Sequence, residues 1–303
     1  MKTVTLLFLN FWEHFDPYNN KITNILKQKY NIIILRPEDN ITPDLLIYSC
    51  FIKYNIYKYD CPKLYITGEN DVPDFNICDY AIASSKLEFN KRYLYIPYFA
   101  LFTDTYKKLW NTDKMFHSDL YDRMFCSCVV RNIEQADPMR KTIINAVDNY
   151  KPIAFGGSYR NNVSGPVIDK LGFINLFKFN IATENSNVAG YITEKIVDAY
   201  IANTIPIYWG TNDITSIFNP YSFINVNDYK NIDSFITALS EIDNNNELYM
   251  DIIQASPLLP NLELTYNEQI EKFLTNIIDN LHIKYTTKYG RVQIINSINY
   301  IIQ

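Results

Sequence analysis

Apolar positions in the first third of the chain fall into short runs separated by polar segments. Such runs, rich in β-branched and aromatic residues, are typical of strands buried in a parallel sheet. A stretch with helical spacing, at about Asn20–Tyr30, separates the first two runs, and strands that alternate with helices predict an α/β domain. The strands predicted in this part are Thr3–Leu9, Asn31–Leu35, Asp44–Tyr48, Lys63–Thr67, Tyr80–Ala83 and Tyr93–Tyr98.

The middle of the chain repeats the alternation of apolar runs and helical spacing. The predicted strands are Met124–Arg131, Ile153–Gly157, Lys178–Glu184, Ile205–Gly210 and Ser222–Val226. The predicted helices are Pro138–Tyr150, Val167–Leu176, Tyr191–Asn203, Ile232–Ile242 and Glu247–Ala255.

A chain of 303 residues is long enough for two hydrophobic cores, and a polar stretch without strong periodicity separates the two alternating parts. The pattern predicts a first domain over residues 1–115 and a second over 116–265. The last segment, 266–303, contains a predicted helix at Asn267–Leu281 that can cross back to the first domain. Its final residues, 290–303, have an amphipathic pattern that suits docking on the fold itself, on a partner or on a membrane surface.

Polar residues concentrate in one predicted strand–helix–strand unit, residues 177–210. In open α/β sheets, ligands bind outside the carboxyl ends of the strands, beside helix N-termini. The polar residues that follow the first strand of the unit are Glu184, Asn185 and Ser186. Spacing of i, i+3, i+4 and i+7 predicts one helical face for Tyr191, Glu194, Lys195 and Asp198.

This face has two interpretations. In the first it is a solvated surface on which Lys195 pairs with Asp198. In the second it binds an anion, because a cation near a helix start opposes the macrodipole and the like charges of Glu194 and Asp198 repel at i, i+4. Spacing alone leaves both open.

Several motifs resemble the α-1,3/4-fucosyltransferases, glycosyltransferase family 10, and are most similar to the short bacterial members. They are Glu184-Asn185-Ser186, Gly190–Lys195 and Ile205–Gly210, supported by segments 65–82, 125–140 and 156–161. Thr183 stands where the family usually has phenylalanine. The resemblance implies a GT-B fold, in which two Rossmann-like domains face each other across a cleft. It also implies transfer of L-fucose from GDP-fucose to a sugar hydroxyl, with inversion at the anomeric carbon.

Glu69 is the candidate catalytic base. It follows the predicted strand Lys63–Thr67, so its carboxylate can take a proton from an attacking hydroxyl that lies within hydrogen-bonding distance. Position alone favours a turn residue whose carboxylate satisfies loop amides. The resemblance covers Gly68-Glu69-Asn70 and implies the catalytic role.

Arg140 and Lys195 are the candidates for stabilising the leaving group. Asp137 and Pro138 predict an N-cap and a first helical position, which places Arg140 in the first turn of its helix. Two cations at two helix starts form a strong anion site. The alternative is that both are ordinary surface cations. The resemblance implies that they neutralise the diphosphate.

The resemblance also implies further donor contacts. Tyr191 and Glu194 are expected to bind the GDP ribose, and Glu184 and Asn185 to line the donor pocket near the fucose or the guanine.

Three more residues have open interpretations. Arg160 and Asn161 follow a Gly-Gly pair and either support the donor pocket or belong to a plain turn. Trp12, after the first strand, either stacks on an acceptor sugar or packs in the core.

Composition argues against several classes of partner and cofactor. The net charge of −5 argues against nucleic acid as a partner. Five scattered cysteines suggest neither a disulfide framework nor a metal site and favour a reducing compartment. The three histidines are far apart, and no Asp-x-Asp motif occurs, so we expect no cofactor and no required divalent metal.

The N-terminal apolar run is too short to span a membrane and lacks a signal-peptide cleavage pattern. We therefore expect a soluble cytoplasmic protein without a membrane anchor.

The sequence thus predicts an inverting α-1,3-fucosyltransferase with GDP-fucose as co-substrate and a galactose/N-acetylglucosamine-type glycan as acceptor. One alternative is a catalytically silent module that binds a nucleotide sugar or a glycan. Another is a transferase that uses a different nucleotide sugar.

Overall fold

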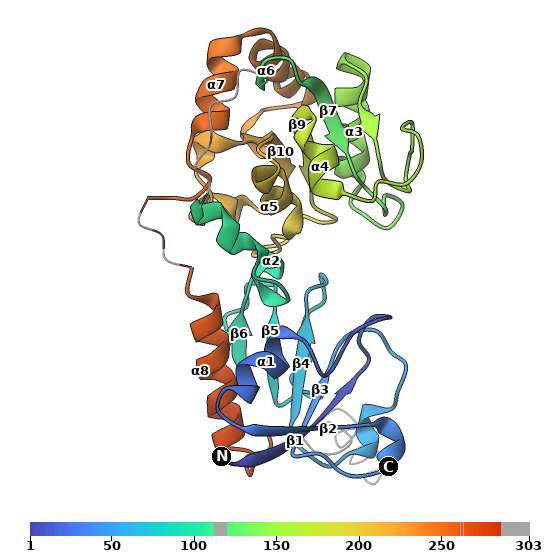
Figure 1. Cartoon of the computed structure of the whole chain (residues 1–303), viewed down its shortest axis with the longest axis vertical. Helices are drawn as coiled ribbons and strands as arrows, with labels where there is room; N and C mark the ends of the chain where they lie inside the picture. Colours follow the sequence, from blue (N-terminus) through green and yellow to red (C-terminus); the bar gives the residue numbers. More distant parts are fainter. Residues whose placement is uncertain (112–119, 261, 263, 286–303) are drawn as a thin grey trace, which may run out of the picture. The chain divides into compact units, whose positions relative to one another are not determined.

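The computed structural model describes residues 1–111, 120–260, 262 and 264–285. The chain divides into two compact units (Figure 1). Unit 1 comprises residues 1–103 and the chain from 264 onward, and unit 2 comprises residues 104–263. The division therefore lies at 103/104, whereas the sequence pattern predicted 115/116. The amphipathic pattern predicted for 290–303 lies outside the described residues.

Unit 1 contains a six-stranded sheet in the order β2-β1-β3-β4-β5-β6, and all of its strand pairs are parallel. The strands are β1 (Thr3–Leu9), β2 (Asn31–Leu35), β3 (Leu45–Tyr48), β4 (Lys63–Thr67), β5 (Tyr80–Ala83) and β6 (Tyr93–Tyr95). The short 3-10 helices are η1 (Pro37–Asp39) and η2 (Ile56–Lys58). β3, β4 and β5 are buried along their whole length, which explains why continuous apolar runs identified them.

In the described residues of unit 1 the α-helices are α1 (Lys21–Lys27), α2 (Tyr98–Leu101) and α8 (Tyr266–Asp279). α8 comes from the end of the chain, contacts α1 and packs the ring of Phe273 against Tyr80 of β5. The predicted strand over Tyr93–Tyr98 ends early because Pro97 caps α2. Proline is tolerated at the start of a helix, but it is disfavoured inside a strand because it has no N–H for the ladder.

Unit 2 contains a five-stranded parallel sheet in the order β11-β10-β9-β7-β8. Its strands are β7 (Met124–Cys128), β8 (Ala154–Phe155), β9 (Phe177–Thr183), β10 (Ile205–Trp209) and β11 (Ile224–Asn225). Its α-helices are α3 (Pro138–Tyr150), α4 (Lys170–Asn175), α5 (Glu194–Ile201), α6 (Ile232–Asn244) and α7 (Asn246–Gln254). Shorter 3-10 helices are η3 (Thr105–Asn111), η5 (Asn212–Ser216), η6 (Pro220–Ser222) and η7 (Val226–Asp228).

The start of α5 differs from the prediction. Gly190 has a φ of 83°, which only glycine adopts readily, and the chain turns there before an extended N-cap at Thr193. The helix therefore begins at Glu194. Tyr191 lies outside it, so the prediction that Tyr191 shares a helical face with Lys195 is wrong.

The parallel register brings the carboxyl ends of neighbouring strands to one edge of each sheet. In unit 2, Trp209 of β10 lies opposite Thr183 of β9. In unit 1, Leu9 of β1 lies opposite Tyr48 of β3, which in turn lies opposite Tyr65 of β4. The polar residues that follow these strands therefore collect at the edge where α/β proteins bind ligands.

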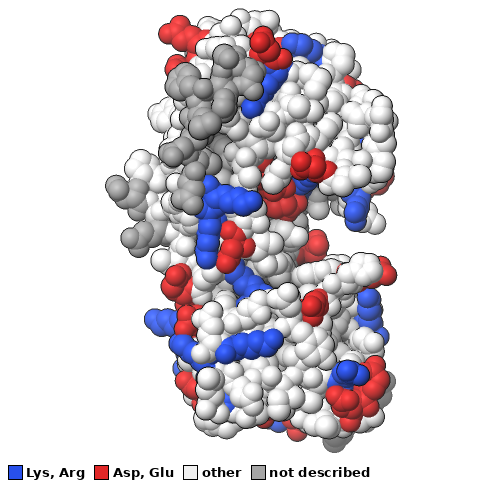
Figure 2. Space-filling view, in the orientation of Figure 1, with Lys and Arg blue, Asp and Glu red and all other residues white. Residues whose placement is uncertain are grey.

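Within the described part of the chain, none of the helices combines the length and the apolar character that crossing a bilayer requires. On the face in view, lysines and arginines lie interspersed with aspartates and glutamates (Figure 2).

Candidate functional site

Glu184 directly follows β9, and its carboxylate is completely buried. One oxygen accepts from the backbone N–H of Thr193 at 2.7 Å, and the other accepts from the Thr193 hydroxyl at 2.7 Å and from Lys195 Nζ at 3.0 Å. A Cβ on Gly210 would lie 2.8 Å from Cγ of Glu184, so glycine after β10 leaves room for this side chain. With both oxygens engaged, Glu184 ties Thr193 and Lys195 at the start of α5 to the end of β9, and the donor contact expected from the sequence stays a prediction.

Lys195 lies in the first turn of α5 with 18% of its side chain exposed. Its ammonium donates to Glu184 and to the Thr193 hydroxyl, the latter at 2.8 Å. An ammonium carries three hydrogens, so one donor is left for a ligand. The interpretation that paired Lys195 with Asp198 is wrong, because Asp198 pairs with Lys170 of α4 at 2.6 Å.

Arg140 lies in the first turn of α3, where Asp137 forms the predicted N-cap by accepting from Met139 N–H at 2.9 Å. The guanidinium is only 2% exposed. Its Nη1 donates to the Asn132 carbonyl at 2.8 Å and to Asn185 Oδ1 at 2.5 Å. Its Nε is buried without a hydrogen-bond partner among the described residues.

Burial lowers the pKa of Arg140, and nearby groups that include Cys128 and Glu184 partly oppose this shift. Because an arginine normally titrates above about 12, the side chain stays charged at neutral pH. Within the part of the chain that the structure describes, it has no carboxylate ion-pair partner. Arg140 is therefore a buried cation whose hydrogen-bond acceptors among the described residues are neutral, while Glu184 and Glu194 lie near enough to favour its charged form.

Both cations are held by consecutive residues at the carboxyl end of β9. Asn185 binds Arg140, and Glu184 binds Lys195. The backbone of Asn185 also accepts from Asp137 N–H at 2.8 Å, which ties the start of α3 to the same point. Two helix N-termini and two cations at one strand end favour a negatively charged ligand.

Glu194 and Tyr191 differ in how far they are exposed. Burial raises the pKa of Glu194, but Lys195, Lys170 and hydrogen bonds to the carboxylate together lower it more, so the pKa lies below its ordinary value and the side chain is ionised at neutral pH. Glu194 is half-buried and can accept hydrogen bonds. Tyr191 is buried and lies close enough to Arg140 to favour the charged guanidinium.

Arg160 and Asn161 are exposed in the loop after β8. Arg160 pairs with Asp148 of α3 at 3.1 Å and donates to Asn145, also at 3.1 Å. Asn161 donates to the Gly165 carbonyl within the same loop. These contacts favour the plain-turn interpretation, and the structure joins neither residue to the residues that hold Arg140 and Lys195.

Glu69 lies in unit 1, in the turn after β4. Its backbone N–H donates to the Thr67 hydroxyl at 3.1 Å. Its carboxylate is exposed and makes no hydrogen bond or ion pair with any residue that the structure describes. The alternative in which this carboxylate satisfies loop amides is therefore wrong. A Cβ on Gly68 would lie 2.3 Å from the ring of Tyr98, so this turn requires glycine.

Trp12 follows β1 at the same edge of the unit 1 sheet. Its ring makes edge contacts with Phe15 and Phe102, with centroids 5.1 and 5.0 Å apart, and 37% of the residue is exposed. Trp12 therefore packs in an aromatic cluster, and part of its side chain is also exposed to solvent. Phe102 links it to the turn of Glu69, because Phe102 also packs on Gly68.

Sequence reasoning missed two residues of the unit 2 site. The Thr193 hydroxyl donates to Glu184 and accepts from Lys195. A threonine directly before a helix is a common N-cap, so the sequence could have identified this residue. Lys170 pairs with Asp198 from 28 positions away, a separation that no local pattern reveals. Among the described residues, no group of three or more His, Cys, Asp or Glu side chains is placed to hold a metal ion.

Two family models match the chain. Residues 6–102 match the "Alpha-(1,3)-fucosyltransferase FucT N-terminal domain", and residues 121–255 match "Glycosyltransferase family 10 (fucosyltransferase) C-term".

Curated relatives agree with these matches. The chain is 34% identical over 285 residues to the alpha-(1,3)-fucosyltransferase FucT of Helicobacter pylori, which covers 82% of this chain and 59% of that protein. It is 28% identical over 270 residues to the putative fucosyltransferase R654 of Acanthamoeba polyphaga mimivirus, which covers 84% of this chain and 42% of that protein. The chain thus spans about half the length of these relatives.

Solved structures extend the similarity to the fold. A crystal structure of an alpha1,3-fucosyltransferase with GDP superposes with a TM-score of 0.77 at 30% identity, covering 92% of this chain and 91% of that chain. The form with GDP-fucose gives a TM-score of 0.75 at 29% identity and covers 92% of both chains. Anabaena Alr3699/HepE with UDP-glucose, at 10% identity and a TM-score of 0.52, covers 90% of this chain and 100% of that one and shares the fold alone.

Proposed function

The chain belongs to the family 10 glycosyltransferases and has the GT-B fold, and from this premise we propose that it is an inverting α-1,3-fucosyltransferase. The donor is GDP-fucose, and the acceptor is a hydroxyl of a galactose/N-acetylglucosamine-type glycan. The similar alpha1,3-fucosyltransferase structures contain GDP-fucose and GDP, which supports the choice of donor.

The observation that carries the proposal is the buried guanidinium of Arg140. A buried charge without a counter-ion carries an effective penalty of several kcal/mol. Among the described residues, Arg140 Nε has no partner and Lys195 Nζ has two, which leaves one donor on each, and both cations are held by residues at the end of β9. A nucleotide diphosphate supplies the missing negative charge and accepts both sets of hydrogen bonds.

In the proposed reaction, Glu69 takes the proton of the acceptor hydroxyl while the oxygen attacks the anomeric carbon of fucose. The bond between that carbon and the diphosphate oxygen breaks, and GDP leaves with the bonding electron pair. Arg140 and Lys195 stabilise the charge that develops on the diphosphate. A single displacement on the face opposite the leaving group converts a β-linked donor into an α-linked product.

Glu194 serves this site as an ionised acceptor for the ribose hydroxyls. Tyr191, which is buried, contributes to the same ribose site, and Asn185 holds the guanidinium in place. Glu184 keeps Lys195 oriented. Because two fixed cations supply the positive charge, we propose that turnover needs no divalent ion. Turnover that survives exhaustive chelation is the expected result, and activity that returns only with manganese or magnesium would contradict this point.

All five cysteines are free thiols, and four of them are buried. This cysteine usage supports a reducing compartment, and we propose the cytosol as the location.

Release of GDP from GDP-fucose, measured with and without glycan acceptors, tests the function. The wild-type protein is expected to release GDP in an acceptor-dependent way, whereas a silent binding module would release none. Glu69→Gln is expected to lose turnover and to bind GDP as the wild type does. A Glu69→Gln protein that turns over at a near-normal rate would reject the proposed base.

A thermal-shift comparison of GDP with UDP tests the donor class. A ligand that binds only the folded protein raises its apparent stability, by about 2.7 kcal/mol at a hundredfold excess over Kd. GDP is expected to raise the melting temperature more than UDP does, and the reverse order would indicate a different nucleotide sugar.

A further inference from the structure

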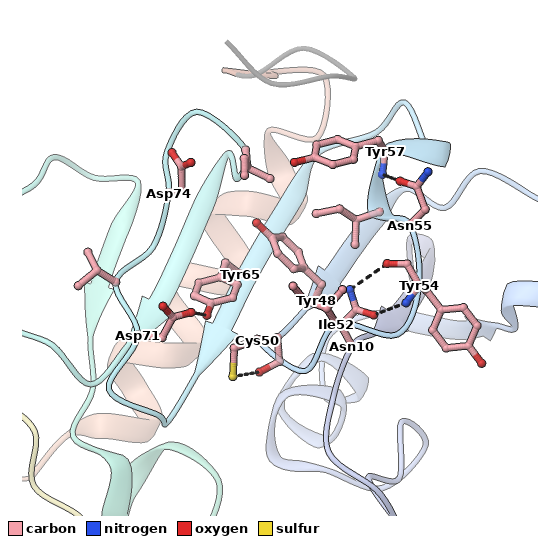
Figure 3. A pocket seen from close by; sticks show the side chains of 14 residues that line it. Asn10, Tyr48, Cys50, Ile52, Tyr54, Asn55, Tyr57, Tyr65, Asp71 and Asp74 are labelled. Carbon is pink, nitrogen blue, oxygen red and sulfur yellow. Dashed lines mark hydrogen bonds between the residues drawn. The ribbon is translucent and has the colours of Figure 1, made fainter. Parts of the chain in front are cut away.

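A cavity lies wholly within unit 1, at the carboxyl edge of its sheet. It has a volume of about 400 Å³, within the range of small-ligand sites. Asn10 after β1, Cys50 after β3 and Asp71 after β4 contribute to its wall. Figure 3 shows the rings of Tyr48, Tyr57 and Tyr65 around the same hollow.

The wall combines aromatic rings with hydrogen-bonding groups and a negative charge. Its polar side chains are the hydroxyls of tyrosines and Ser49, the Cys50 thiol, asparagine amides and the carboxylates of Asp71 and Asp74. No lysine, arginine or histidine is among the described residues that line it. Aromatic faces pack on apolar ring surfaces, whereas carboxylates and amides accept hydrogen bonds from hydroxyls. These groups suit a neutral, hydroxyl-rich ring and disfavour an anion.

Asp71 is oriented toward the cavity by its neighbour. The Tyr65 hydroxyl donates to Asp71 Oδ2, and Oδ1 makes no hydrogen bond with any residue in the described ranges (Figure 3). Asp71 is also joined to the catalytic turn, because its backbone N–H donates to the Glu69 carbonyl at 2.8 Å. Two residues of chain span at most about 7 Å, so the backbone of Asp71 lies close to that of the proposed base.

The rim of the cavity is held in place before any ligand arrives. Asn10 has a left-handed φ of 61°, which asparagine tolerates better than most residues. Its side-chain oxygen accepts from the backbone N–H groups of Lys53 and Tyr54 at 2.9 and 2.7 Å, and its amide donates to the Tyr54 carbonyl at 3.1 Å. Preorganisation of this kind reduces the entropy lost when a ligand binds.

We propose that this cavity is a subsite for a neutral sugar of the acceptor glycan, next to the sugar whose hydroxyl Glu69 deprotonates. The inference rests on the proposed function and adds the residues that select the acceptor. Asp71 accepts hydrogen bonds from the sugar hydroxyls, and Tyr57 packs on the ring. An acceptor that places a carboxylated sugar in the cavity is disfavoured by Asp71 and Asp74.

Cys50 provides a direct measurement, because it lines the cavity and is half-buried, whereas the other four cysteines are buried. Alkylation of the native protein by iodoacetamide is followed at Cys50 by mass spectrometry. A neutral galactose/N-acetylglucosamine oligosaccharide, added well above its KM, is expected to slow alkylation at least threefold. GDP alone and a sialylated oligosaccharide are expected to protect much less. An unchanged alkylation rate with the neutral oligosaccharide would overturn the inference.

Substitutions supply the second measurement. Asp71→Asn and Tyr57→Ala are each expected to raise the acceptor KM about tenfold, which corresponds to about 1.4 kcal/mol, and to leave the GDP-fucose KM unchanged. Tyr18→Ala is the control, because Tyr18 is an exposed tyrosine of unit 1 outside the cavity. A normal acceptor KM in both cavity variants would contradict the assignment.

The experiments distinguish failure of the acceptor subsite from failure of the proposed fucosyltransferase function. Fucose transfer by the wild type, with no protection of Cys50 and no change in KM, removes the subsite and keeps the proposed function. Protection of Cys50 by the oligosaccharide without any transfer keeps the subsite and removes the function.

Discussion

The buried carboxylate of Glu184 offers a test of how the unit 2 site is built. Glu184→Gln preserves the shape of the side chain but removes the charge that faces Lys195 and the start of α5. Three hydrogen bonds end on this carboxylate, and one of them comes from an ammonium. Hydrogen bonds to charged groups contribute about 1.5–3 kcal/mol each. The glutamine amide also introduces an N–H donor, whereas the Thr193 N–H and the Lys195 ammonium can only donate and need an acceptor.

We therefore expect unit 2 to lose about 2–3 kcal/mol of stability without any ligand present. For a unit of this size, such a loss lowers the melting temperature by about 5–10 °C. The assay is thermal unfolding of the ligand-free protein, followed by the KM for GDP-fucose, which is expected to rise because Lys195 is no longer oriented. Glu134→Gln is the matched control. It makes the same change in unit 2 at a side chain that is 80% exposed and, among the described residues, pairs with Lys141 alone.

Two outcomes separate the possible roles of Glu184. A residue that only contacts the donor would leave the melting temperature of the ligand-free protein unchanged while raising the KM. A Glu184→Gln protein that melts within about 1 °C of the wild type, as the Glu134→Gln control is expected to do, would refute the positioning role.

Two further substitutions test the same region. Thr183 is buried, and its hydroxyl lacks a partner in the described part of the chain, so Thr183→Val is expected to raise stability by about 1 kcal/mol; a lower melting temperature would contradict this. The pKa of Glu194 is depressed, so its contribution to stability is present above the unfolded pKa of about 4.3 and is lost as pH falls through the folded pKa. Glu194→Gln should therefore lower the urea midpoint at pH 7 more than at pH 3, and an equal or larger effect at pH 3 would contradict the depressed pKa.

The strands and the long helices could be predicted because their signals are local. β1, β4 and β5 are apolar runs whose ends coincide with polar residues, and α3 has a capping residue and a proline at its start. The errors arose where a single backbone conformation decides the boundary. Gly190 delays the start of α5, and Pro97 ends β6.

The candidate site was only partly predictable, because its chemistry depends on distant contacts. The family motifs identified Arg140, Glu184 and Lys195, but the bond between Arg140 and Asn185 joins residues 45 positions apart. Whether a carboxylate such as Glu184 is exposed or buried depends on β10 and α5 packing around it. No pattern in the sequence contains that information.

The central claim is that Arg140 and Lys195 together form the site for a nucleotide diphosphate. Calorimetric titration of GDP and of guanosine into the wild type, Arg140→Met and Lys141→Met tests it most directly. Lys141 is the matched control, since it is the next residue of α3 and carries the same charge at the surface. Breaking a buried charge pair costs about 3–5 kcal/mol, so Arg140→Met is expected to weaken GDP binding at least a hundredfold and to leave guanosine binding unchanged. GDP affinity in Arg140→Met equal to that in Lys141→Met would contradict the account.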